Sequence, residues 1–133
     1  MSLPPLPNEH VPRRFVVLRH DSPRGLHWDF MLEAEGSLRT WALAEEPCGP
    51  LSCSAEQLPD HRLAYLDYEG DVSGGRGVVN RYDSGEYRVR QCDADHVIVD
   101  LAGGRLRGRA TLVRQGDQRW SFSFASSGAA ASG

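Results

Sequence analysis

Two histidines and one aspartate have the residue types and the spacing that best suit metal chemistry in this chain. His27 and Asp29 lie two residues apart in a segment, 26–33, that alternates strictly between apolar and polar residues. Successive side chains of a β-strand point to opposite faces, so we expect both on one face, about 6.5 to 7 Å of strand apart. His20 ends the preceding β-rich run, and the short turn after it can bring His20 beside His27.

The chemistry available to these three residues is metal coordination. Two imidazoles and one carboxylate that converge in this way can bind a divalent transition metal and leave positions open for water or a phosphate oxygen. The same residues would also occur on an exposed polar face that binds no ligand. Spacing alone leaves both interpretations open.

A second pair of polar side chains follows later in the chain, at His61 and Tyr65. If a strand begins at Leu63, the two lie on one face, where an imidazole and a phenol could flank a substrate phosphate or a metal-bound water. A tyrosine in a strand more often serves packing. The glycine-rich segment 70–77 lacks the ending of a phosphate-binding loop and the helix that would follow it, so we interpret it as a flexible loop that carries Arg76.

We expect β-strands to position these side chains. Between the ends of the chain, apolar and polar residues mostly alternate with a period of two, which is typical of strands. The strand-like runs are 13–20, 26–33, 37–43, 63–68, 77–82, 86–91, 96–101, 106–113 and 119–124. Turn sequences such as 83–85 separate these runs, and only 54–58 has helical potential. We therefore predict an all-β fold, a small closed antiparallel β-barrel of about eight strands, because closure removes exposed sheet edges.

The alternation in 26–33 also assigns faces. The even-numbered positions carry Leu, Trp, Phe and Leu, and we expect them to fill the barrel. The odd-numbered positions, which include His27, Asp29 and Met31, should face outward. This assignment predicts a site on the outer surface, with Met31 as an apolar exception on a polar face.

The charge balance limits the classes of partner. All fifteen basic residues are arginine, there is no lysine, and eighteen Asp and Glu give a net charge of −3. A protein held to nucleic acid by bulk charge normally carries a basic excess, so the balance argues against that class. Local arginine clusters remain possible, because the guanidinium fork suits phosphate.

The length of 133 residues predicts one domain. We expect a flexible N-terminal arm at 1–12, a folded domain at 13–124 and a disordered tail at 125–133. No apolar run approaches the roughly 18 to 20 residues of a membrane helix, and the first residues lack a signal peptide's apolar region. Three cysteines at no metal-ligand spacing predict reduced thiols. We therefore expect a cytoplasmic protein with no membrane partner.

Several blocks of the sequence resemble a known family. The runs 14–21 and 26–33 are similar to the opening motif of the 3′-phosphoesterase domain of bacterial DNA ligase D, approximately F-V-V-x-[KR]-H-D-A-R-R-L-H-[YW]-D-F-R-L-E. Further similar blocks occur at 36–42, 60–70 and 106–114. From the first block to the last, the resemblance extends over nearly the whole of 13–124.

The resemblance implies an eight-stranded β-barrel whose active site lies on its outer surface. It implies a metal-dependent enzyme that trims 3′ ends of DNA or of RNA-tailed primers in DNA repair, by hydrolysing a phosphodiester or a 3′-phosphomonoester. His20, His27 and Asp29 match the family's metal ligands, His61 its phosphate-contacting histidine, and Tyr65 the tyrosine nearby. Manganese is the expected metal, with zinc or another transition metal as alternatives. Nucleic-acid 3′ ends, and a ligase or repair protein, are the expected partners.

The sequence departs from the family pattern at residues that should hold phosphate. Met31 replaces an arginine, Glu45 corresponds to a lysine, Cys53 falls where an arginine is expected, and the glycine-rich segment is shortened to 73–77. Each lost charge-assisted contact costs about 1.5 to 3 kcal/mol. The arginines that could compensate are Arg14, Arg19, Arg24 and Arg76. On this interpretation, Met31→Arg should raise any residual activity.

Three functions follow from these observations. The first is a metal-dependent 3′-end-processing phosphoesterase. The second is a catalytically weakened or inactive metal-binding barrel that binds a nucleic-acid end or a repair protein. The third is a metalloenzyme acting on another small substrate, because two histidines and a carboxylate also bind non-haem iron. The changes at Met31, Glu45 and Cys53 favour the second and third.

Overall fold

The structure, a computed structural model, describes residues 13–48 and 50–127. The predicted arm at 1–12, and residues 128–133 of the predicted tail, lie outside this part of the chain. The strands are β1 (Arg13–Ser22), β2 (Gly25–Ala34), β3 (Ser37–Leu43), β4 (Leu51–Arg62), β5 (Gly70–Asp71), β6 (Val78–Cys92), β7 (His96–Gly103), β8 (Arg107–Gly116) and β9 (Arg119–Ser126), and one short 3-10 helix, η1 (Leu63–Leu66), follows β4. None of the helical structure in these ranges is long and apolar enough to cross a membrane.

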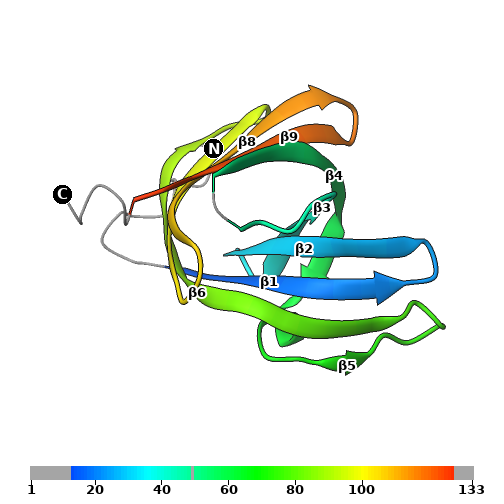
Figure 1. The fold of residues 1–133 in the computed structure, drawn as a ribbon. Coiled ribbons are helices and arrows are strands. Elements are labelled where there is room, and N and C mark those ends of the chain that lie inside the picture. The colour runs from blue at the N-terminus through cyan, green and yellow to red at the C-terminus, as the bar shows by residue number, and fades with distance from the viewer. Residues whose placement is uncertain (1–12, 49, 128–133) are drawn as a thin grey trace.

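Eight strands form a closed antiparallel ring. The order of pairing is β1-β2-β3-β4-β9-β8-β7-β6, and β6 pairs back onto β1 (Figure 1). The short strand β5 adds to the other edge of the first part of β6. The predicted all-β fold with about eight antiparallel strands in a closed arrangement is confirmed.

The interior of the ring holds the main core, and aromatic side chains fill much of it. Phe30 packs on Phe122 with ring centroids 5.4 Å apart, and Trp41 meets the edge of Trp120 at 5.5 Å. The even positions of β2 from Trp28 onward face this core, as the alternation predicts. Leu26 is the exception: at the start of β2 it lies beyond the core and 41% of its surface is exposed.

A second apolar cluster covers part of the outer face of β1 and β2. It consists of Val16, Leu18, Met31, Leu38, Leu66, Val72 and Val79. Leu66 comes from η1 and Val72 from the loop after β5, so these segments lie over the sheet. Met31 faces outward, as the alternation predicts, but this cluster covers it and it is only 1% exposed. Alternation gives the direction of a side chain but not the segment that packs on it.

The segment between 51 and 68 also differs from the prediction. Residues 54–58, expected to have helical potential, belong to β4, where Cys53 and Ala55 alternate inward with exposed neighbours. The run 63–68, expected to be a strand, contains η1 instead. Pairing with β3 and β9 on both sides extends β4, and this tertiary context overrides local propensity.

The predicted turn at 83–85 is absent, because β6 runs through it as one bulged strand. The buried carboxylate of Asp83 accepts hydrogen bonds from the backbone N–H groups of Gly104, Arg105 and Leu106. Gly85 packs directly on its neighbour strand, since a Cβ there would lie 2.2 Å from the carbonyl oxygen of Ala102. The Asp-Ser-Gly sequence therefore serves side-chain pairing and close packing of strands.

Candidate metal centre and its cavity

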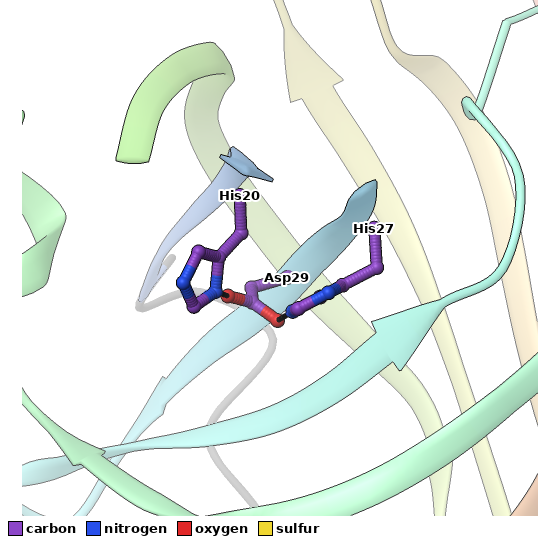
Figure 2. Close-up of side chains that lie close together, drawn as sticks. All are labelled: His20, His27 and Asp29. Atoms are coloured by element: carbon purple, nitrogen blue, oxygen red, sulfur yellow. Dashed lines mark hydrogen bonds and ion pairs between the residues drawn. The ribbon is translucent and has the colours of Figure 1, made fainter. Parts of the chain in front are cut away.

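Strand register brings His20 and His27 together. They are direct partners in the β1–β2 hairpin, and their ring centroids lie 4.6 Å apart. Asp29 follows on the same face of β2 and points between them (Figure 2). Its Oδ2 lies 3.0 Å from Nδ1 of His20, and its Oδ1 lies 3.0 Å from Nε2 of His27.

The three side chains fit a divalent metal ion. One ligand atom from each lies within 4.8 Å of the other two. Oδ1 of Asp29 is buried and accepts no well-aligned hydrogen bond in the described chain, although Nε2 of His27 is close. A buried carboxylate oxygen without such a partner is costly, and a cation between the oxygen and the imidazole nitrogens would satisfy it.

The electrostatics of the cluster favour a charged carboxylate. Burial alone would raise the pKa of Asp29, but the two histidines outweigh this effect and hold the pKa below its ordinary value. The hydrogen bond to Asp29 raises the pKa of His20, against burial, which lowers it. The carboxylate is therefore ionised at neutral pH, as a metal ligand must be.

A backbone carbonyl orients His20 from its other side. Nε2 of His20 lies 2.7 Å from the carbonyl oxygen of Arg76. A carbonyl oxygen only accepts hydrogen bonds, so Nε2 carries the proton, and in the neutral ring the lone pair is on Nδ1, which faces Asp29. Metal-ligating histidines are commonly held in this way.

Gly77 allows that carbonyl to approach. A Cβ at Gly77 would lie 1.9 Å from the carbonyl oxygen of Asp21, and the backbone φ of +99° also favours glycine. The loop before β6 therefore packs directly on the end of β1, next to His20. The interpretation of 70–77 as a flexible loop did not include this contact.

One cavity of about 1580 Å³ contains both predicted groups of residues. His20, His27 and Asp29 line it, and so do His61 and Tyr65. The rings of His61 and Tyr65 are in edge contact at 5.6 Å. A strand beginning at Leu63 was expected to place Tyr65 on one face with His61. Tyr65 lies instead on η1, and it reaches His61 because the chain turns after β4.

The orientation of His61 is also set by a carbonyl. Its Nδ1 donates to the carbonyl oxygen of Pro59 at 2.9 Å, so Nε2 is the nitrogen left for a ligand. Both His61 and Tyr65 are partly exposed. Their ring contact and shared cavity bring them together, although the strand that predicted their proximity does not form.

The residues that replace the expected basic positions lie in three different environments. Met31 is buried in the outer apolar cluster at the cavity, whereas the buried side chain of Cys53 packs in the core inside the ring. Burial raises the pKa of the Cys53 thiol, which keeps it neutral. Glu45 is exposed and is not part of the cavity lining. One of the three replacements, Met31, therefore puts an uncharged side chain at the cavity.

Three of the four arginines proposed to compensate have side-chain partners, although one of these three, Arg76, lines the cavity. Arg14 pairs with Asp67 and Arg19 with Asp21, and the Arg76 side chain donates to Ser73. Arg24 lines the cavity and has no side-chain hydrogen bond or ion pair among the described residues.

Two further arginines at the cavity were not predicted from the sequence. Arg62 and Arg119 line the cavity, both are exposed, and within 13–48 and 50–127 neither has a side-chain hydrogen bond or ion pair. Arg62 could have been found as the neighbour of His61. Arg119 could not, because only the β4–β9 register brings it to this face.

A comparison with protein families identifies proteins that are similar to this chain. The model of the DNA ligase D 3′-phosphoesterase domain matches residues 18–114, which is more than half of the chain. The chain belongs to this family. Within the phosphoesterase domain match lie both histidines and the aspartate of the metal cluster, together with His61 and Tyr65.

Curated relatives of the phosphoesterase domain family include multifunctional non-homologous end joining proteins named LigD. The chain is 36% identical over 115 residues to the DNA repair protein LigD of Mycobacterium tuberculosis, covering 80% of this chain and 15% of the relative. It is 35% identical over 111 residues to LigD of Pseudomonas aeruginosa, covering 76% of this chain and 13% of the relative. The chain therefore spans less than a fifth of the length of these relatives.

Proposed function

We propose that this protein is a metal-dependent phosphoesterase that processes 3′ ends of DNA, or of RNA-tailed primers, in DNA repair. The observation that carries the proposal is that the cluster of His20, His27 and Asp29 lines the same cavity as His61. Family membership and the repair proteins among the relatives support an end-processing role. The partners are nucleic-acid 3′ ends and, in repair, a ligase or another repair protein.

The metal ligands in this proposal are Nδ1 of His20, Nε2 of His27 and a carboxylate oxygen of Asp29. A bound divalent metal, manganese by family resemblance, supplies neutralisation of phosphate charge and a lower pKa for water. Two imidazoles and one carboxylate leave coordination positions for substrate and solvent. Zinc and other transition metals suit the same ligands.

His61 is the proposed catalytic residue that contacts the phosphate. With Nδ1 donating to Pro59, a protonated Nε2 can donate to a phosphoryl oxygen and stabilise the charge that develops there. Tyr65 touches the His61 ring and can position it or donate its hydroxyl to the same phosphate. Charge-assisted donors at this location act in a partly enclosed cavity, where they are stronger than in water.

Arg62 is one cavity-lining cation that can replace the basic residue lost at Met31. It directly follows His61, lines the same cavity, and has no side-chain partner in the described part of the chain. An arginine in that position can form a bidentate contact with phosphate. We include Arg62 among the phosphate-binding residues.

A second candidate function is a binding protein for nucleic-acid ends with little or no catalysis. The observation that favours it is the buried, uncharged side chain of Met31 at the cavity. In that case the metal cluster would still hold a terminal phosphate, but turnover would be absent.

A primer–template assay tests the proposal. Three substrates differ only at the primer end, which carries a 3′-phosphate, a single 3′-ribonucleotide or a 3′-hydroxyl. With Mn²⁺ we expect phosphate release from the first and shortening of the second, and neither reaction with EDTA. Asp29→Asn should abolish both reactions. Metal-dependent binding of the 3′-phosphate end without any release would support the second candidate, and full activity of Asp29→Asn would refute the proposed site.

A further inference from the structure

The cavity extends well beyond the metal cluster, across the outer faces of three more strands. Strand register connects Asp29 on β2 to Ala42 on β3, Ala42 to Glu56 on β4, and Glu56 to Arg119 on β9. All four residues line the cavity. Neighbouring strands are about 4.8 Å apart, so this row covers about 14 Å from the metal cluster to Arg119.

Short side chains form the floor of this extension, which we call the β3–β9 trough. Its floor residues are Ala42, Ala44, Ser52, Ser54 and Ser121, and each lines the cavity. Side chains of this size leave open space above the sheet. The whole cavity, at about 1580 Å³, exceeds the roughly 300 to 1,000 Å³ typical of a small-molecule pocket. One terminal phosphate and its sugar would leave most of it empty.

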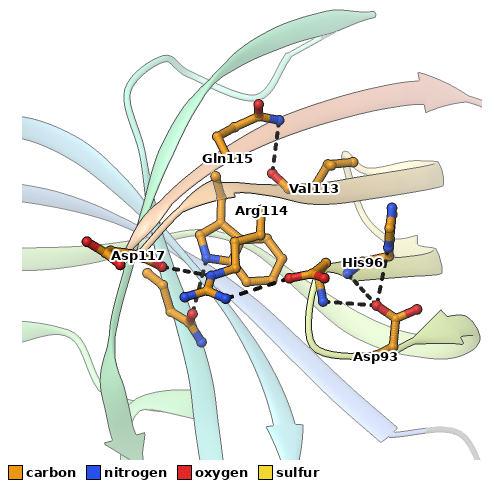
Figure 3. Close-up of polar contacts among 9 residues, drawn as sticks. Asp93, His96, Val113, Arg114, Gln115 and Asp117 are labelled. Atoms are coloured by element: carbon orange, nitrogen blue, oxygen red, sulfur yellow. Dashed lines mark hydrogen bonds and ion pairs between the residues drawn. The ribbon is translucent and has the colours of Figure 1, made fainter.

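The far end of the trough presents a cation from a firmly held turn. Arg114 donates from Nε to the carbonyl oxygen of Asp117 at 3.0 Å and pairs with Asp95 (Figure 3). Gln115 donates to the hydroxyl of Ser121 at 3.2 Å across the same hairpin. Arg119 begins β9 directly after this turn. It is exposed and makes no ion pair with Glu56, its register partner.

The chemistry of the trough suits a sugar–phosphate backbone. Serine hydroxyls and arginine are among the side chains that contact phosphate and sugar in protein–nucleic acid complexes, and such contacts position the strand without reading its sequence. Arg119 is the trough's basic residue at the end farthest from the metal cluster. A strand whose 3′ end reaches the metal cluster would pass over the small floor residues toward it.

We propose that the β3–β9 trough binds the nucleic-acid strand upstream of its 3′ end, with Arg119 contacting a backbone phosphate several nucleotides from the terminus. This inference rests on the proposed function, because it takes the metal cluster as the place of the 3′ end. Binding here depends on the length of the strand and is independent of its sequence.

Oligonucleotides of two lengths test this inference. Fluorescent dinucleotides and octanucleotides, both 3′-phosphorylated, are titrated with the protein in Mn²⁺ and followed by anisotropy at several salt concentrations. Wild-type protein should bind the octanucleotide more tightly than the dinucleotide. Arg119→Gln should reduce the ratio of these two affinities by about 5- to 20-fold. It should also lower the slope of log affinity against log salt concentration for the octanucleotide by about 1.

Two further variants make the result specific. Arg107→Gln removes an exposed arginine of β8 that does not line the cavity, and it should leave the ratio unchanged. Ser54→Trp fills the floor and should lower octamer binding without removing a charge. The inference is overturned if wild-type protein binds the octanucleotide and the dinucleotide with equal affinity. It is also overturned if Arg119→Gln leaves the ratio of the two affinities at the wild-type value.

The same samples separate this inference from the proposed function. Phosphate release from the dinucleotide reports the function without the trough. If phosphate is released but Arg119→Gln does not change how binding depends on oligonucleotide length, only the proposal for the trough is refuted. If binding depends on length and requires Arg119, but neither oligonucleotide releases phosphate, the proposed enzymatic function is refuted and the proposal for the trough stands.

Discussion

Nε2 of His20 lies 2.7 Å from the backbone carbonyl oxygen of Arg76, so a residue 56 positions away in sequence sets the proton position of a metal-ligand candidate. The carbonyl reaches His20 because the loop before β6 packs against Asp21, and that packing requires glycine at position 77. Metal affinity should therefore depend on a residue that offers no ligand atom.

Gly77→Ala should weaken Mn²⁺ binding. The new Cβ would collide with the carbonyl oxygen of Asp21, so the loop must move and His20 loses its partner. Loss of such an outer contact typically costs 10- to 100-fold in metal affinity. Isothermal titration calorimetry measures this change. Gly75→Ala is the matched control, because Gly75 also has a positive φ, of +68°, but a Cβ there meets nothing within 4 Å. Equal affinities for the two variants would contradict the role of the contact.

Met31→Arg should destabilise the fold, which revises the expectation drawn from the sequence. Met31 is 1% exposed and packs in the outer apolar cluster, so a guanidinium there loses apolar contacts and buries charge. We expect a loss of about 2 to 4 kcal/mol in the free energy of unfolding, measured in urea. Met31→Leu should cost less than about 1.5 kcal/mol. An arginine variant as stable as wild type, with faster phosphate release, would show that the clamp can be restored here.

His61→Ala should lower kcat by about 100- to 1,000-fold while Mn²⁺ affinity stays unchanged. His61 is proposed to stabilise charge on the phosphoryl group, and it is not among the three clustered metal-ligand candidates. Steady-state kinetics on a 3′-phosphorylated primer, together with calorimetry, separate the two effects. Arg62→Gln should act mainly on KM, because a guanidinium that binds phosphate contributes in the ground state as well. If His61→Ala also loses Mn²⁺ affinity, His61 is itself a metal ligand.

Tyr87 should make the fold sensitive to alkaline pH. Burial raises the pKa of Tyr87 to about 12, and its hydroxyl donates to the carbonyl oxygen of Glu33 at 2.6 Å. The unfolded chain ionises near pH 10, so the stabilisation is complete below pH 10 and is lost as pH rises toward 12. Denaturant unfolding should show a steeper fall above pH 10 for wild type than for Tyr87→Phe. The phenylalanine variant should be less stable by about 1 kcal/mol at pH 8. Identical slopes above pH 10 would contradict this assignment.

Local patterns predicted the parts of the structure that depend on strand alternation and on short hairpins. His27 and Asp29 share a face because they are two residues apart in a strand, and His20 meets His27 across a short turn. Long-range packing determined the rest. The cover over Met31 comes from η1 and the loop near Val72, which no period in the sequence connects to β2.

The cavity, too, depends partly on local sequence patterns and partly on long-range packing. His61 and Tyr65 were paired on the assumption of a strand, and they meet because the chain turns into η1 instead. Arg119 reaches the cavity only through the register of β4 with β9, which are far apart in sequence. No local pattern in the sequence indicates such a register.

The most direct test of the central claim is phosphate release by metal-stripped protein as Mn²⁺ is added back. Wild-type protein and His96→Ala should release phosphate from a 3′-phosphorylated primer, with saturation in Mn²⁺, because His96 of β7 lies outside the cavity lining. His27→Ala should show no release at concentrations that saturate the wild type. Release without added metal, or equal Mn²⁺ dependence in His27→Ala and wild type, would contradict a hydrolytic metal centre at His20, His27 and Asp29.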